Sequence, residues 1–202
     1  MSVKPQRTRD EQADATRATL IATARRLFAR RGFPDVSVDE IVQAAGLTKG
    51  ALYHHFRDKQ ELFRGVVEQI EQAIQERLIA AASQPGDGVA RLRAACHAYL
   101  DACTEDEVGR IVVLDSPAVL GWDAWCKLNR EYGLGFFVDR LRAIRRDDPA
   151  IESTAQMLMG ALNVAGRVIA QSEDRPAARS QVGMTIDRLL AGVAGTAGSS
   201  ST

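Results

Sequence analysis

The chain has 202 residues, enough for one or two domains with a substantial core, and its 26 Lys and Arg balance 26 Asp and Glu. It contains no apolar run near the ~20 residues that a bilayer crossing needs. Its polar start, MSVKPQRTRDEQAD, lacks the apolar region of a secretory signal, so we expect a cytoplasmic protein with no membrane partner. The charges are unevenly distributed, because the part through Arg64 carries +4 and the remainder −4. A basic module at one end is typical of a protein that binds a polyanion there.

The first expected element is a long helix from about Arg9 to Arg31, with its apolar residues on one face. Gly32 ends this helix and Pro34 prevents it from resuming. The helix is expected to support the element that follows it rather than to form a site of its own.

The stretch from Val36 to Lys59 has the capping pattern of two short helices joined by a tight turn. Ser37 and Glu40 form an S-x-x-E capping box at the start of the first helix. Gly46 provides the left-handed residue that ends it, and Thr48 is a side-chain N-cap for the second helix. Helix, Gly-containing turn and helix together predict a helix-turn-helix unit.

The second of these helices has an exposed face, because Leu52 and Phe56 share the side that must point inward. Its N-terminal turn is the end that enters a major groove in helix-turn-helix proteins. Lys49 could donate to guanine, Gly50 lets the backbone approach base edges, and Ala51 could offer its methyl group to thymine. Thr48 belongs to the same turn, and Ser37 is a further expected DNA contact. The donors suited to phosphate oxygens are Tyr53, His54, His55 and Lys59.

These residues resemble the DNA-binding domain of the TetR/AcrR family of bacterial transcriptional regulators. The resemblance covers roughly Thr16 to Phe63 and is densest in AAGLTKGALYHHFRDKQELF, where it is carried by Gly-x-x-Lys-Gly-x-x-Tyr-x-x-Phe-x-x-Lys. It implies phosphate contacts from Tyr53, His55 and Lys59. The family has little similarity in its second domain, so no ligand-binding residue is transferred by the resemblance.

The fold class that follows is all-α, with an N-terminal three-helix helix-turn-helix DNA-binding domain and a C-terminal helical ligand-binding and dimerisation domain. We expect the first domain over residues 1–64, with 1–8 as a disordered arm that is either solvated or contacts DNA. The second domain is expected over 65–195, followed by a disordered tail at 196–202. The helix from Lys59 keeps its spacing to about Ser83, so one element is expected to link the two domains.

Beyond the break at Gln84–Gly88, the pattern stays helical. Arg110–Leu120 is interpreted as a buried helix rather than a strand, because no second strand-like run could pair with it. Pro117 is expected to mark a kink or break in this run.

The expected ligand-binding residues of the second domain are aromatic or polar side chains on apolar helices. They could line a mostly apolar cavity with a few polar groups, although each aromatic could equally be core, and the last two could instead bridge a dimer. They are Tyr99, Asp115, Trp122, Trp125, Tyr132, Phe136, Asn163 and Arg167.

The last two helices have heptad-like apolar seams, one from Ile151 to Ile169 and one from Val182 to Val193. Such seams favour a homodimer in which two helices of each copy form a four-helix bundle. The alternative is that the seams face only the core of their own domain.

The predicted function is a sequence-specific DNA-binding transcriptional regulator, a repressor released from its operator by a small-molecule effector, with no cofactor. The alternatives are a helical scaffold protein that does not read DNA, or an enzyme using Asp115 or the His54–His55 pair. An enzyme is not expected, because the chain lacks a glycine-rich phosphate loop, metal-ligand spacing and a nucleophile triad. The three cysteines, Cys96, Cys103 and Cys126, form no CxxC and are interpreted as buried hydrophobes, with redox sensing as the alternative.

Overall fold

The computed structural model describes residues 9–195, and the described part of the chain is helical without a strand. The chain divides into two compact units, 1–67 and 68–202. The prediction of an all-α fold is therefore confirmed. The predicted arm at 1–8 and tail at 196–202 lie outside the described residues. None of the described helices combines the length and apolar character that a bilayer crossing requires.

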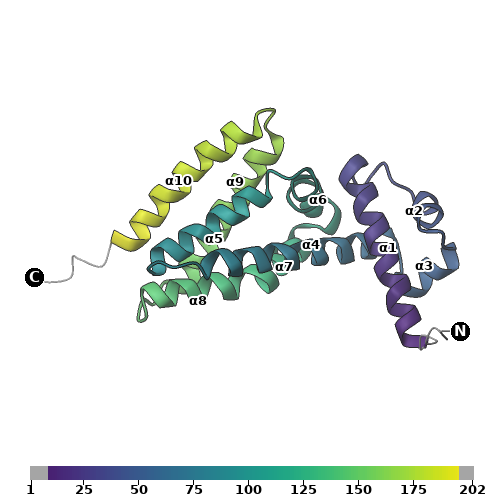
Figure 1. Ribbon diagram of the computed structural model, residues 1–202, viewed down its shortest axis with the longest axis horizontal. Coiled ribbons are helices and arrows are strands. Elements are labelled where there is room, and N and C mark those ends of the chain that lie inside the picture. Colours follow the sequence, from purple (N-terminus) through teal and green to yellow (C-terminus); the bar gives the residue numbers. More distant parts are fainter. Residues whose placement is uncertain (1–8, 196–202) are drawn as a thin grey trace, which may run out of the picture. The chain divides into compact units, whose positions relative to one another are not determined.

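The first unit contains α1 (Arg9–Arg31), α2 (Val38–Ala45), α3 (Lys49–His55) and the start of α4 (Lys59–Ala82). In Figure 1, α2 and α3 lie beside α1, which they contact. Its core contains the fully buried Leu20, Ile41 and Leu52. An aromatic cluster adds to this core, with ring centroids 5.0–5.6 Å apart in the pairs among Phe28, Phe33 and Phe63.

The second unit begins within α4, which continues without interruption to Ala82. It then contains α5 (Gly88–Ala102), η1 (Val108–Asp115), α6 (Ser116–Leu120), α7 (Trp122–Asn129), η2 (Arg130–Leu134), α8 (Gly135–Ile144), α9 (Ile151–Gln171) and α10 (Arg175–Gly195). The elements η1 and η2 are π-helical. In Figure 1, α9 and α10 pack against each other, and both contact α5.

The run Arg110–Leu120 is helical, as predicted, but it does not break at Pro117. The buried hydroxyl of Ser116 donates to the carbonyl of Ile111, five residues earlier, at 2.7 Å. Pro117 is the second residue of α6, which follows η1 without a break. The chain turns instead at Gly121, whose φ of 83° favours glycine.

The prediction that the α9 seam faces a second copy is wrong. Ala155, Leu162 and Ile169 of this seam are at most 2% exposed and belong to the core of their own unit. The exposed apolar residues of α9 are on a different face, at Met157, Val164 and Val168. On α10, the predicted seam is divided, because Ile186 is buried and Leu189 is 49% exposed, while the Val193 side chain lies outside the described residues.

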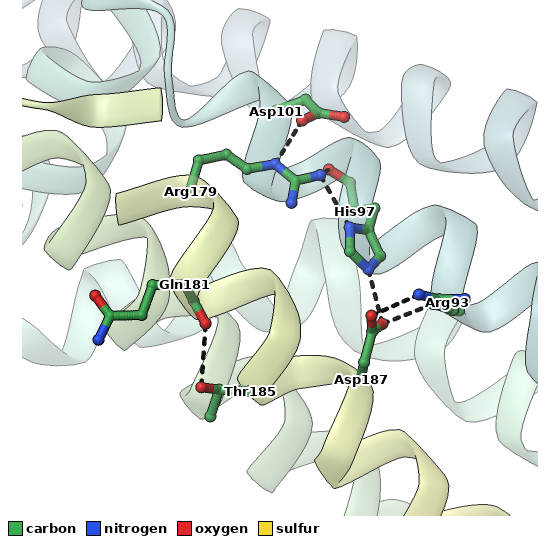
Figure 2. A network of polar contacts seen from close by, with 7 residues as sticks. All are labelled: Arg93, His97, Asp101, Arg179, Gln181, Thr185 and Asp187. Atoms are coloured by element: carbon green, nitrogen blue, oxygen red, sulfur yellow. Dashed lines mark hydrogen bonds and ion pairs between the residues drawn. The ribbon is translucent and has the colours of Figure 1, made fainter. Parts of the chain in front are cut away.

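A polar network joins α5 to α10 (Figure 2). Arg93 donates to both carboxylate oxygens of Asp187, at 2.7 and 2.6 Å. His97 also contacts Asp187, and Arg179 donates to Asp101 at 2.6 Å. These contacts link residues 78 to 94 positions apart in the chain and fix the register of α10 on α5.

Candidate functional site

The turn between α2 and α3 is built by local hydrogen bonds, as its sequence predicts. The Ser37 hydroxyl accepts from the Glu40 backbone N–H at 3.2 Å, and the Ser37 N–H donates to the Glu40 carboxylate at 2.8 Å. Arg31 also pairs with Glu40 at 2.6 Å, and its hydrogen bond with those from Ser37 lowers the pKa of that carboxyl to about 2. Gly46 has a φ of 66°, the left-handed cap that ends α2.

The first turn of α3 presents an open, exposed surface. The Thr48 hydroxyl accepts from the Ala51 N–H at 3.1 Å, while Leu52 and Phe56 anchor the opposite face in the core. A side chain added at Gly50 would meet only the Thr48 hydroxyl, at 3.7 Å. Nothing in the first unit therefore obstructs the approach of another molecule to this turn.

The expected phosphate donors of α3 lie at the surface. Tyr53 is 52% exposed, and the rings of His54 and His55 lie edge to face with centroids 5.1 Å apart. Lys49 forms an ion pair with Asp39 at 2.8 Å, which raises the pKa of Lys49. This pair is exposed on both sides, so little free energy opposes its exchange for a contact with a nucleic acid.

Lys59 has an architectural role that the sequence did not reveal. Its ammonium donates to the backbone carbonyls of Phe33 and Val36, at 2.7 Å each, and lies 4.0 Å from the centroid of the Phe33 ring. Partial burial lowers the pKa of Lys59, and the nearby carboxylates of Asp35 and Glu40 reduce this shift. The side chain thus ties the start of α4 to the connection between α1 and α2, and one of its three N–H donors is not used by these carbonyls.

The second unit contains a cavity of about 460 Å³, within the range of small-molecule sites. It brings together five of the eight expected ligand-binding residues, which are Tyr99, Trp122, Trp125, Asn163 and Arg167. The indoles of Trp122 and Trp125 lie with centroids 5.1 Å apart and tilted by 41°. Apolar side chains such as Val112 and Val113 complete the wall.

A chain of hydrogen bonds crosses one side of this cavity. The Tyr99 hydroxyl donates to Asn163, and the Asn163 amide donates to Asn129, both at 3.1 Å. The Asn129 amide in turn donates to the backbone carbonyl of Trp125 at 3.0 Å. Burial raises the pKa of Tyr99, so its phenol remains a neutral donor. The side-chain amides of Asn129 and Asn163 therefore both have hydrogen-bond partners within the protein.

Tyr99, Asn129 and Asn163 also line a second, smaller cavity of about 40 Å³. Tyr132 and Glu71 are part of its wall. Burial raises the pKa of Glu71 to about 7, so a carboxyl that is close to half protonated at neutral pH lies beside the small cavity.

Other expected residues are not part of these cavities. Asp115 lies 3.9 Å from Arg110, and Phe136 packs against Phe137 and Arg140. Sequence reasoning missed Glu71, Asn129, Arg130 and Gln156 as wall residues, because each could equally be a solvated position on an amphipathic helix.

The thiols of Cys96 and Cys103 are buried in the second unit, and burial raises the pKa of each to about 12. Since the thiolate is the reactive form, these two cysteines have the environment of packing residues rather than of sensors. Within residues 9–195, no group of three or more His, Cys, Asp or Glu side chains could hold a metal ion.

The fold and the exposed turn of α3 define a helix-turn-helix protein with a separate helical domain. A family profile described as "Bacterial regulatory proteins, tetR family" matches residues 20–66. A second, described as "Tetracyclin repressor-like, C-terminal domain", matches residues 89–193. The chain belongs to the TetR family of transcriptional regulators.

Individual relatives agree with this assignment. A TetR-family transcriptional regulator from Pectobacterium atrosepticum has a crystal structure with a TM-score of 0.82 and 38% identity, covering 93% of this chain and 97% of that one. The Transposon Tn10 TetC protein of Escherichia coli is 30% identical over 62% of this chain and 63% of its own length. The HTH-type transcriptional regulator AcrR of Shigella flexneri is 36% identical over 51% of this chain and 48% of its own length. The chain thus spans less than two-thirds of the length of either curated relative.

Proposed function

We propose that the protein is a homodimeric repressor that binds a near-palindromic operator and leaves it when a small molecule binds the second domain. The observation that carries the proposal is the exposed first turn of α3, capped by Thr48 and open at Gly50. In helix-turn-helix dimers, two such turns lie about 34 Å apart in successive major grooves. The domains proposed for these roles are residues 1–64 and 65–195, and the site of action is the DNA of the cytoplasm.

In this proposal, the bases are read by Lys49, Gly50 and Ala51, and the phosphates are bound by the surrounding hydroxyl, imidazole and ammonium donors. Those donors are Ser37, Thr48, Tyr53, His54, His55 and Lys59. Support comes from the exposure of Thr48, Lys49, Gly50, Tyr53 and His54 in the first unit.

We propose the exposed apolar face of α9 as the dimer contact, together with α10. Met157, Val164 and Val168 recur at intervals of seven and four, and Met157 is 76% exposed. An apolar stripe of this kind favours burial against a second copy in an isologous interface. Met157→Asp is expected to shift the protein to monomer in sedimentation velocity, whereas Ala143→Asp on the exposed surface of α8 should leave the dimer intact.

The effector is proposed to occupy the cavity of about 460 Å³ and to act through α4, which is one uninterrupted helix from Lys59 to Ala82. A ligand shifts the protein between two states only to the extent that it binds them unequally. A small molecule that prefers the state with a changed spacing of the recognition helices would release the operator.

The decisive experiment is selection of bound duplexes from a random pool, followed by affinity measurements over a range of salt concentrations. We expect an enriched sequence with two inverted half-sites and an affinity that falls steeply with salt, because phosphate contacts release counterions. Recovery of no enriched sequence, together with no binding to duplex DNA at low salt, would contradict the proposal and favour a scaffold protein.

A further inference from the structure

The large cavity of the second unit has an unbalanced set of hydrogen-bonding groups. The amides of Asn129 and Asn163 and the hydroxyl of Tyr99 already bond to one another, as described above. What remains on the wall is the amide of Gln156, which can donate and accept, and the guanidinium groups of Arg130 and Arg167, which only donate and have no hydrogen bond or ion pair within residues 9–195. The charged groups left for a ligand are therefore all donors, which favours a ligand that supplies acceptors.

Trp125 adds a further donor to this wall. Its indole N–H is buried and has no acceptor among the described residues, although the ring itself lines the cavity. An unmade hydrogen bond of a buried donor is costly, and a small rotation of the ring toward a ligand acceptor would break no existing bond of this N–H. The indole N–H is therefore an unused donor of a residue that lines the cavity.

The charged side chains on the wall of the large cavity are all positive. The wall includes Arg130 and Arg167 but no Asp or Glu. Glu71 lines the small cavity rather than the large one. Two cationic, planar donors without an internal counterion favour an anion, and guanidinium groups bind carboxylates in particular through paired N–H donors.

The remaining wall is apolar and aromatic. The paired indoles of Trp122 and Trp125 offer flat faces, and Trp122 is 68% exposed, which leaves apolar surface uncovered in the absence of a ligand. We propose that the effector is an amphipathic anion, an aromatic carboxylate whose ring packs on the indoles and whose carboxylate is held by Arg130 and Arg167. This inference rests on the proposed function for its regulatory meaning, but binding can be tested without DNA.

The test uses isothermal titration calorimetry of the full chain with three probes of one shape: 2-naphthoate, 2-naphthamide and 2-naphthylmethylamine. We expect 2-naphthoate to bind at least about tenfold more tightly than the neutral amide, and the cationic amine to bind most weakly. In the double variant Arg130→Gln and Arg167→Gln, the acid and the amide should bind within about twofold of each other, while amide binding stays as in the wild type. Arg91→Gln, at an exposed position of α5 outside the cavity, should keep the full preference.

Equal or tighter binding of the amine would overturn the proposal, as would an unchanged preference in the double variant or no binding of any probe. Because both arginines are exposed, their variants are expected to fold, and an unchanged circular dichroism spectrum establishes this. The two proposals fail through different results. Selection of an operator together with a preference for the amine would contradict only the proposed effector chemistry. A preference for the acid together with no binding to duplex DNA would contradict only the proposed function.

Discussion

The Nη2 atom of Arg179 lies 2.9 Å from Nδ1 of His97, where α10 contacts α5 (Figure 2). Since a guanidinium group can only donate, Nδ1 must be the acceptor, and the ring proton is assigned to Nε2. Nε2 faces Asp187 at 2.8 Å, so it donates to the carboxylate. The network therefore accepts one tautomer of His97 and holds it from both sides.

This relationship predicts that Arg179 stabilises the second unit. Arg179→Met removes donors to Asp101 and His97 and leaves Nδ1 without a partner, and we expect a loss of about 2 kcal/mol in the free energy of unfolding. The side chain of Arg179 is only 18% exposed, so solvent replaces these bonds poorly. Arg188→Met, at an exposed position of the same helix, is the matched control and should cost much less.

Both tryptophans belong to the second unit, so urea unfolding followed by tryptophan fluorescence reports on that unit. Equal losses in Arg179→Met and Arg188→Met would show that the network contributes no more than exposed charge.

Asp187 predicts a dependence of stability on acid. Its hydrogen bonds from Arg93, and then from His97, lower the pKa of the carboxyl from 3.8 to about 2. A carboxyl with a lowered pKa in the folded state stabilises the protein above its unfolded pKa, and this contribution is lost as the pH falls toward 2. The difference in unfolding free energy between the wild type and Asp187→Asn should be constant above about pH 5 and shrink between about pH 4 and 2. A difference that stays the same across this range would contradict the assignment.

Much of the first unit could be predicted from sequence because its determinants are local. The capping box of Ser37 and Glu40, the left-handed Gly46 and the N-cap Thr48 each act within a few residues, and all are found. The role of Lys59 could not be predicted in the same way. Its carbonyl partners, Phe33 and Val36, lie more than 20 residues earlier and meet it only in the folded unit.

The second unit was less predictable because its helices are apolar on more than one face. On α9, the heptad seam and the stripe containing Met157 and Val164 are both apolar, and periodicity alone does not indicate which faces the core. The cavity walls are assembled from several elements of the unit, so single side chains such as Asn129 carry no local signal of their position. Five expected cavity residues were found because small-molecule sites combine aromatic walls, here Tyr99, Trp122 and Trp125, with a few polar groups, here Asn163 and Arg167.

Lys59 and Tyr53 are predicted to differ in the kind of effect that their loss produces. Lys59→Met removes donors to two backbone carbonyls and should weaken the first unit by about 1–3 kcal/mol. Tyr53→Phe removes an exposed hydroxyl and should leave stability unchanged, while lowering affinity for all DNA sequences alike if the hydroxyl binds phosphate. Hydrogen exchange of peptides within residues 20–56 measures the first effect, and titration of duplex DNA measures the second. Faster exchange in Tyr53→Phe, or unchanged exchange in Lys59→Met, would reverse these roles.

Glu71 predicts a stability change near neutral pH with the opposite sign to that of Asp187. Burial raises the pKa of its carboxyl from 4.5 to about 7, so the folded state binds the proton more tightly than the unfolded chain. Stability should therefore fall as the pH rises from about 4.5 to 7, because ionisation of a buried carboxyl costs free energy. Glu71→Gln cannot ionise and should match the wild type at about pH 4 but exceed it by up to about 3 kcal/mol at about pH 8. Glu76→Gln, at an exposed position on the same helix, should not show this gain. Urea unfolding at the two pH values measures the effect, and a Glu71→Gln gain that is the same at both would mean that the carboxyl ionises freely in the folded protein.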